Sequence, residues 1–293
     1  VSCLALVALL SAVLGCPALT HAQQGAAAMT TSVSAPPTDR ANSFYVSNRA
    51  PLVRNPLLKL PIGSITPEGW LHHMLVLEAE GMTGHLDELS QFLPFEVSAW
   101  ASPTGEGRSG WEELPYWLKG YGDLGYVLKD EALIRNARRW IEAVLASARE
   151  DGWFGPRGLL TSLKGKPDLW PHMVMLNALQ SYYEATGDKR VLTLMADYFR
   201  WELNQPEEDF LAGFWGPVRA GDNMESVQWL YNRTGEEWLL HLVDKIQRRC
   251  AKWTDGIASW HGVNISQAFR QPAHYYVQTG NPMFLQLAER NYG

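Results

Sequence analysis

Apolar residues recur at helical spacing along most of the chain. In two stretches the spacing is most regular: steps of four join Trp238, Leu242, Ile246 and Cys250, and steps of three and four join Leu133, Ala137, Trp140 and Val144. Such periodicity is typical of amphipathic helices that bury one face. The pattern predicts nine helical runs, at 66–82, 112–128, 131–149, 170–186, 188–204, 222–234, 236–253, 264–279 and 281–292. We therefore expect an all-α fold.

One turn phrase recurs between these runs, as YVLKDE (126–131), YEATGD (183–188), YNRTGE (231–236) and YVQTGN (276–281). The last three phrases contain Gly187, Gly235 and Gly280, which follow one another at intervals of 48 and 45 residues. Glycine can take the left-handed conformation that ends a helix, and Asp188 or Asn281 can then cap the next one. A period of this length predicts stacked helical hairpins.

The first residues predict export. Residues 4–14 are apolar but too few to span a bilayer, and 20–22 (THA) supply the small residues of a signal-peptidase site. We expect a signal peptide at 1–22, a disordered linker at 23–42, and a folded part at 43–293. A lipoprotein signal with Cys16 as the lipid-bearing residue is the alternative. Either signal predicts a periplasmic or secreted protein.

Charge and cysteine content narrow the classes of partner. The net charge is −6, the isoelectric point is near 5.8, and no basic run occurs. These values disfavour nucleic acid as a partner. They also disfavour binding to anionic membranes, apart from the membrane contact that the export signal itself makes. Only Cys250 is left after residue 22, so we expect no disulfide and interpret this thiol as a packing residue on its apolar stripe.

Tryptophan is unusually abundant, with thirteen residues in 293. Several lie in probable connections beside Gly, Pro and carboxylates, in DGWFGP (151–156), DLWPH (168–172), AGFWGP (212–217) and SWHGVN (259–264). Buried indoles often only fill a core. Aromatic faces flanked by hydrogen-bonding groups are also what an exported protein offers to sugar rings, so both interpretations stay open.

The ordered motifs resemble a known family. They are SNRAPLVRNPLLKLPIGSITPEGWL (47–71), TGHLDEL (83–89), GWEELPYWLKGYGDLGYVLKDEALI (110–134), DGWFGP (151–156), SYYEATGD (181–188), GDNMESVQWLYNRTGEEWLL (221–240) and HGVN (261–264). Together they resemble the β-L-arabinofuranosidase-like glycoside hydrolases, family 127. The resemblance implies an (α/α)₆ barrel of six helical hairpins, usually followed by β-sandwich domains. It also implies attack on non-reducing terminal sugars of plant-type oligo- or polysaccharides.

The chain departs from this family pattern in two respects. The nine predicted helices are fewer than the twelve of a six-hairpin barrel, and no β-sandwich is predicted. The family's nucleophile is a zinc-held cysteine thiolate, whose Cys and Glu ligands fall in a part that these 293 residues lack. No cofactor site is therefore expected in this chain, although zinc is expected in a full-length member. We interpret the chain as the amino-terminal part of such an enzyme, or as a truncated gene product.

Candidate catalytic residues are groups able to transfer protons at the ends of helices. Asp222 and Glu225 open a predicted helix at a spacing of three, which places them on one face. His261 lies in a Gly-containing loop, and His172 lies at a helix start after a Pro. Helix capping is the alternative for Asp222, and a hydrogen bond to a nearby carbonyl is the alternative for His261.

Candidate sugar-binding residues lie beside these groups in the sequence. They are Trp111, Glu113, Asp168, Trp170, Asn223, Trp260 and Asn264. Two further functions stay open. One is a catalytically silent or truncated toroid that binds glycans. The other is a metal-free six-hairpin uronide hydrolase or polysaccharide lyase.

Overall fold

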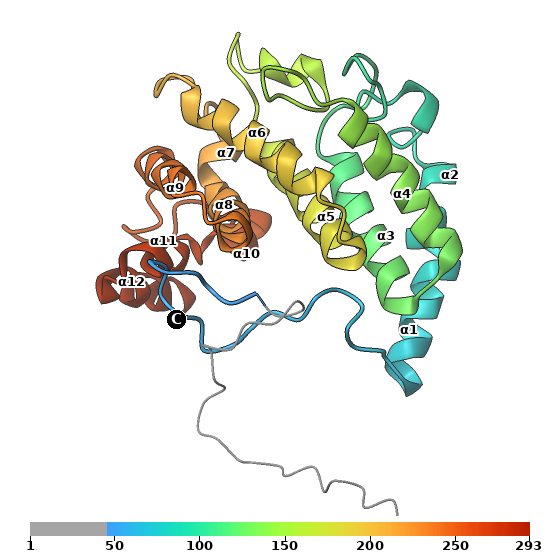
Figure 1. Cartoon of the computed structure of the whole chain (residues 1–293), viewed down its shortest axis with the longest axis horizontal. Helices are drawn as coiled ribbons and strands as arrows, with labels where there is room; N and C mark the ends of the chain where they lie inside the picture. Colours follow the sequence, from blue (N-terminus) through green and yellow to red (C-terminus); the bar gives the residue numbers. More distant parts are fainter. Residues whose placement is uncertain (1–45) are drawn as a thin grey trace, which may run out of the picture. The chain divides into compact units, whose positions relative to one another are not determined.

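Helical hairpins make up the fold, as Figure 1 shows for a computed structural model that describes residues 46–293. Four hairpins follow one another: α3 (Glu113–Leu128) with α4 (Glu131–Ala146), α5 (Trp170–Thr186) with α6 (Arg190–Asn204), α8 (Ala220–Thr234) with α9 (Trp238–Arg249), and α11 (Gln271–Thr279) with α12 (Pro282–Tyr292). Helices α1 (Gly69–Glu80) and α2 (Met82–Leu89) precede them. The prediction of an all-α fold is confirmed for these residues, among which only two isolated β-bridges occur. The predicted signal peptide and linker lie outside the described residues.

The structure holds two helix boundaries that the prediction missed. The run at 66–82 is α1 alone, and α2 begins after Gly81 in a stretch that was not predicted helical. The run at 264–279 divides into α10 (Gly262–Ala268) and α11, with Pro272 in the first turn of α11. Proline lacks the amide hydrogen that a helix interior needs, so a new helix starts there. The connections also hold a short helix α7 (Trp215–Val218) and two 3₁₀ turns at Phe95–Val97 and Arg157–Leu160.

The hairpins are arranged in two layers. Helices α3, α5, α8 and α11 pack against one another in this order and form the inner layer, whereas α4, α6 and α9 form the outer layer. Each inner helix continues through a tight turn into an outer helix, so the inner helices run parallel. Because they run parallel, the amino ends of the inner helices lie at the same end of the layer.

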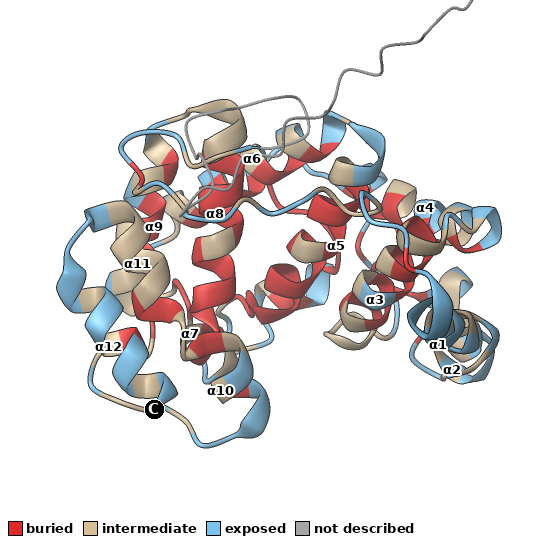
Figure 2. Cartoon of the chain, turned by 90° about the horizontal axis from the view of Figure 1, so that it is seen from below, coloured by how far each residue is buried: buried red, intermediate tan, exposed pale blue. Residues whose placement is uncertain are grey.

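Two of the inner helices are also the most deeply buried. In Figure 2, α5 and α8 are buried over most of their length, whereas α1 and α12 are largely exposed.

The repeated turns have the predicted geometry. Gly187, Gly235 and Gly280 take left-handed φ values of 72°, 75° and 66°, and each follows the last residue of an inner helix. The amide of each glycine donates to the carbonyl of the Tyr four residues earlier. The Asn281 side chain accepts from the amide of Met283 at 3.0 Å and caps α12, as expected. These local bonds explain why the hairpins are tight.

Helix α6 ends differently, without glycine. The buried ammonium of Lys245, which belongs to α9, donates to the carbonyl oxygens of Glu202 and Leu203, both at 2.9 Å. It also donates to the carbonyl of Gln205. These carbonyls lie at the carboxyl end of α6, where that of Glu202 also accepts from the amide of Gln205 at 3.2 Å, and a cation is favourable there because of the helix dipole. A residue about forty positions downstream therefore caps this helix.

Residues 46–66, which we call the strap, cross the carboxyl ends of the inner helices (Figure 2). The amide of Arg49 donates to the Asn232 side chain at 2.9 Å, and the amide of Val53 donates to the Val277 carbonyl at 2.7 Å. Lys59 reaches Glu184 of α5 at 3.3 Å. The strap thus contacts α5, α8 and α11 at the end opposite their amino termini.

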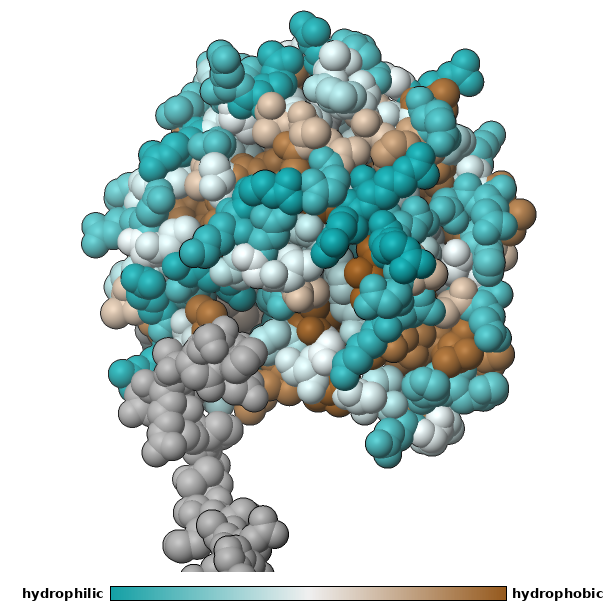
Figure 3. All heavy atoms as spheres, turned by 45° about the vertical axis from the view of Figure 1, so that its right-hand side comes forward, coloured by the Kyte–Doolittle hydropathy of each residue, from teal (hydrophilic) through white to brown (hydrophobic). Residues whose placement is uncertain are grey.

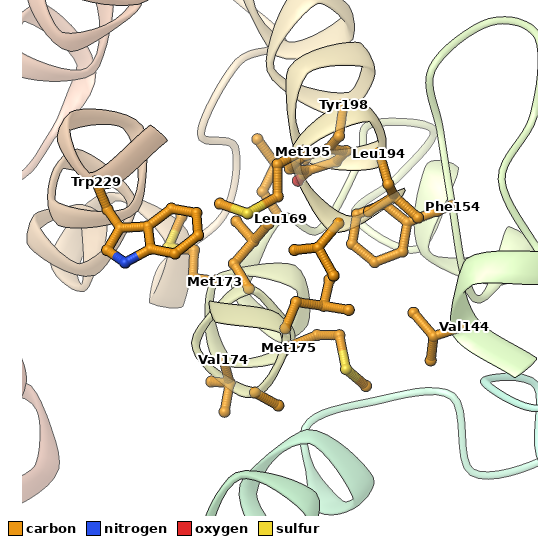
Figure 4. Close-up of a cluster of buried hydrophobic side chains, with 14 of the residues drawn as sticks. Val144, Phe154, Leu169, Met173, Val174, Met175, Leu194, Met195, Tyr198 and Trp229 are labelled. Atoms are coloured by element: carbon orange, nitrogen blue, oxygen red, sulfur yellow. The ribbon is translucent and has the colours of Figure 1, made fainter. Parts of the chain in front are cut away.

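The core contains the predicted stripe of α4, in which Leu133, Ala137, Trp140 and Val144 are all buried. Figure 4 shows neighbouring side chains of α5 and α6 that interdigitate, among them Met173, Met175, Leu194, Met195 and Tyr198. In α9 the stripe is only partly correct. Leu242, Ile246 and Cys250 are buried, but Trp238 is half-buried because Leu239 occupies the core position of the first turn. The guanidinium of Arg200 lies 4.2 Å from the centre of the Trp238 ring.

Helix α1 presents an apolar face to solvent. Trp70 is 78% exposed, and Leu71, Met74 and Leu77 are also exposed, while no residue of this helix is buried. Figure 3 shows a face of the molecule in which hydrophobic side chains gather toward the lower edge among hydrophilic ones. Across residues 46–293, every helix is too short or too polar to cross a lipid bilayer.

We expect Trp140→Ala to lower the free energy of unfolding by about 3–5 kcal/mol, because it truncates a fully buried ring. Trp238→Ala removes a half-buried ring with a stacked cation, so we expect a loss of about 1–2 kcal/mol. Urea denaturation of both variants gives the comparison. Equal losses would contradict the buried face assigned to α9.

Candidate functional site

The amino ends of α3, α5 and α8 meet α10 around one buried cation, Arg219. This side chain immediately precedes α8 and is 3% exposed. Its guanidinium carbon lies 4.2 Å from the Trp170 ring centre and 4.5 Å from that of Trp215. Its Nε donates to Asn264 Oδ1 at 2.7 Å, and its Nη1 donates to Glu112 Oε2 at 3.2 Å. We call these five residues the Arg219 cluster.

The cluster is electrostatically self-consistent. A buried guanidinium is tolerated only with a paired anion and satisfied hydrogens, and Glu112 supplies the anion. The indole Nε1 of Trp170 donates to the same carboxylate oxygen that Arg219 contacts. The two indole faces add cation–π attraction. Together, the ion pair, hydrogen bonds and cation–π contacts of Arg219 fix the amino ends of α3, α5 and α8 relative to the start of α10.

Two predicted residues, Trp111 and Asp168, lie beside the predicted cluster member Trp170. Asp168 Oδ2 accepts from the indole of Trp111 at 3.0 Å, and its Oδ1 accepts from the amide of Trp170 at 3.2 Å. Burial raises the pKa of Asp168, although these two donors oppose the shift. The structure therefore brings Trp111, Asp168 and Trp170 together, and it places a carboxyl with increased affinity for its proton among them.

The loop at 259–264 is held over the same end of the fold. Asn264 is fully buried and donates to Ser259 Oγ at 2.8 Å while it accepts from Arg219. His261 precedes α10, is exposed, and has its ring centre 5.6 Å from that of Trp215. Trp260 is 82% exposed. The loop thus adds a free imidazole and a free indole to the rim of the Arg219 cluster.

Asp222 and Glu225 belong to the same end of α8 but form a second group. Arg270 Nη2 donates to Asp222 Oδ1 at 3.1 Å and to Glu225 Oε2 at 2.6 Å. Because one guanidinium bridges both carboxylates, they share a face of α8, as their spacing predicts. Burial raises the pKa of Asp222 to about 6. Glu225 lies farther along α8 and lines a separate cavity beneath the strap.

The structure does not bring His172 to this site. The imidazole is fully buried among the rings of Trp100, Trp153, Phe154 and Tyr198. It donates to the Phe154 carbonyl at 2.8 Å, and burial lowers its pKa to about 4. A neutral ring with no exposed surface favours a packing role over contact with a substrate.

Asn223 and Glu113 also lie apart from the Arg219 cluster. Asn223 is fully buried and donates to Glu202 Oε2 in the core at 2.8 Å. Glu113 begins α3 with one carboxylate oxygen buried and unpartnered, whereas its neighbour Glu112 makes the bonds to Arg219. The one-residue difference arises because successive residues of a helix point about 100° apart.

Sequence reasoning selected neither Arg219 nor its partner Glu112. One signal was present in the sequence. Arg219 stands directly before the helix that begins near Asp222, where the helix dipole disfavours a cation. A cation at such a position indicates a specific anionic partner elsewhere in the chain.

The described residues do not fit a zinc ion. Across residues 46–293, no three His, Cys, Asp or Glu side chains gather closely enough to hold a metal. Cys250 is a free, buried thiol at the end of α9, and burial raises its pKa to about 11. A thiol that keeps its proton is a poor ligand and a poor nucleophile. Its position on the apolar face agrees with the predicted packing role.

Comparison with known proteins identifies the class as a glycoside hydrolase domain. The family model for the β-L-arabinofuranosidase GH127 catalytic domain matches residues 70–292. The chain belongs to this family, in agreement with the resemblance of its motifs. No curated protein sequence matches the chain.

A solved structure has the same helical fold. It is Ara127N, a GH127 β-L-arabinofuranosidase from Geobacillus stearothermophilus T6, which is similar with a TM-score of 0.50 and 16% sequence identity. The match covers 78% of this chain and 44% of that one, so the chain spans less than half the length of the solved relative. The fold prediction, an incomplete all-α barrel of this family, is confirmed.

The buried pair of Glu202 and Asn223 predicts a pH-dependent stability. Burial raises the pKa of Glu202 from 4.5 to about 7, so the folded protein holds a proton that the unfolded chain releases between these values. The contribution to stability is therefore present below pH 4.5 and lost as pH rises to 7, roughly 1–3 kcal/mol. Glu202→Gln should remove this part of the slope.

Urea denaturation of both proteins between pH 4 and 8 measures the effect. Asp222 titrates in part of the same range in both proteins, so the difference between them isolates Glu202. Parallel pH profiles would show that Glu202 is ionised in the folded protein at neutral pH.

Proposed function

We propose that this chain forms part of an exported glycoside hydrolase that acts on non-reducing terminal sugars of plant-type glycans, in particular β-L-arabinofuranosides. The Arg219 cluster and the loop at 259–264 are its sugar-binding site. One observation carries the proposal: indoles, carboxylates, an amide and an imidazole from four elements converge at the amino ends of the inner helices in a chain of this family.

The arrangement suits a sugar chemically. Sugar hydroxyls both donate and accept, and Trp260 and His261 at the exposed rim can contact a ring and its hydroxyls. Asp168 and Asp222 are carboxyls with pKa raised by burial. A carboxyl that keeps its proton toward neutral pH can protonate the leaving oxygen of a glycoside. We assign this role to Asp222, whose pKa is raised to about 6.

A glycan-binding protein without turnover is the second candidate. It is favoured by Cys250, the single thiol among residues 46–293, because burial raises its pKa to about 11 and so opposes a thiolate nucleophile there. The experiment that separates the two candidates is a panel of aryl glycosides, led by an aryl β-L-arabinofuranoside, together with binding of L-arabinose to the same protein. Turnover supports the hydrolase, binding alone supports the second candidate, and turnover of unsaturated uronides alone would replace both.

We expect His261→Ala to weaken activity on the aryl arabinofuranoside, or affinity for L-arabinose where turnover is absent, by about tenfold, or 1.4 kcal/mol. The melting temperature should change little, because the residue is exposed and its ring packs edge-on against that of Trp215. Arg219→Met is the structural contrast. It leaves the partly buried carboxylate of Glu112 without its cation and removes the hydrogen bond to Asn264, so it should also destabilise the fold by about 1–3 kcal/mol. A stability loss in His261→Ala as large as in Arg219→Met would assign His261 to structure.

A further inference from the structure

A second cavity lies between the strap and the inner helices. Its volume is about 350 Å³, within the range of small-molecule sites. Four elements line it, through Lys59 of the strap, Glu184 of α5, Glu225 and Arg233 of α8, and His274 of α11. None of the five residues of the Arg219 cluster lines it. We call this space the strap cavity.

Several side chains that line the strap cavity carry a buried polar atom without a partner. Among its lining residues, Glu184 Oε2, Arg233 Nε, Arg270 Nε and His274 Nε2 are buried without a hydrogen-bond partner in the chain. Each such group costs roughly 1–3 kcal/mol when it stays unsatisfied. The Glu184 side chain is only 5% exposed, so bulk water does not compensate for the missing bond. Four of these atoms around one cavity favour an occupant that supplies partners.

The charges of the strap cavity are already paired. Arg270 lies 2.6 Å from Glu225 and 3.1 Å from Asp222, which stands just outside the lining, while Arg233 and Lys59 lie 3.4 Å and 3.3 Å from Glu184. With Asp222 counted, three cations are matched by three carboxylates. An anionic ligand would face the unpaired oxygen of Glu184, and a cationic ligand would face two guanidinium N–H groups. Ionic ligands of either sign are therefore disfavoured.

The four unpartnered atoms favour a ligand that can both donate and accept hydrogen bonds. Two guanidinium N–H groups need acceptors, one carboxylate oxygen needs a donor, and the imidazole nitrogen takes either role. Hydroxyl groups meet all of these needs. The amides of Gln228 and Asn232 also line the space, whereas the Trp229 ring is covered by Arg233 at 3.6 Å. Recognition thus depends on hydroxyl groups more than on ring stacking.

We propose that the strap cavity is a second binding site, for a neutral sugar of one or two rings. The site is separate from the Arg219 cluster, and its occupation does not require catalysis. Its ligand contacts the strap together with α5, α8 and α11, so binding also ties the strap to the inner layer.

The test follows individual indole N–H signals by NMR during titration of the full chain with L-arabinose. Trp229, whose Nε1 donates to Glu184 at 3.1 Å, reports on the strap cavity, and Trp215 reports on the Arg219 cluster. We expect a saturable shift of the Trp229 signal. Ala273→Phe, which fills the cavity from α11, should weaken that response at least about tenfold.

Ala273→Ser is the matched control and should bind like the wild type. Glu184→Gln keeps the side-chain shape but replaces a carboxylate oxygen with an amide, and it should weaken the Trp229 response even if Ala273→Phe does not fold. His261→Ala should leave the Trp229 response intact, because it lies outside the cavity.

Three results would overturn the proposal. The first is a Trp229 signal that does not move at roughly 50 mM sugar, far above a millimolar dissociation constant. The second is an equal response to D-galacturonate, which would reject a neutral ligand. The third is a response confined to Trp215, which would leave the proposed function standing while removing the strap cavity as a site.

Discussion

The buried guanidinium of Arg219 is the interaction on which the rest of the candidate site depends. A cation taken out of water must find an anion and hydrogen-bond acceptors at fixed positions, and here Glu112 and Asn264 provide them from α3 and α10. The rings of Trp170 and Trp215 stack on the same guanidinium, so Arg219 holds segments that are distant in the sequence in fixed positions relative to one another. The polar geometry of this end is therefore a product of the same contacts that hold the hairpins together.

The two ends of the inner layer are built differently. At the amino ends, the chain gathers indoles and carboxylates around Arg219 and leaves His261 and Trp260 open to solvent. At the carboxyl ends, glycines in the left-handed conformation reverse the chain, and the strap packs over these turns. The repeated glycine turns thus occupy the carboxyl ends of the inner helices, and the candidate sugar-binding residues lie at the amino ends. This separation agrees with membership of a glycoside hydrolase family.

Sequence periodicity was enough to predict most helices, because a stripe such as Leu133 to Val144 reports burial directly. It failed at two places: α2, which begins after Gly81, was not predicted, and one predicted run crossed the boundary before Pro272. For the site, chemistry in loops identified Asp168, Trp170 and Asn264, which the fold does bring near one another. Arg219 could not be selected in this way, since its partner Glu112 lies 107 residues away and only the fold makes them neighbours.

Lys245 ties the third hairpin to the second. Its ammonium, from α9, donates to three carbonyls at the carboxyl end of α6, and one of these, that of Glu202, also accepts from the amide of Gln205. The end of α6 therefore takes part of its hydrogen bonding from a neighbouring hairpin, whereas the glycine turns of α5, α8 and α11 are closed by local bonds. The stability of each unit in this helical array thus depends in part on the next unit along the chain.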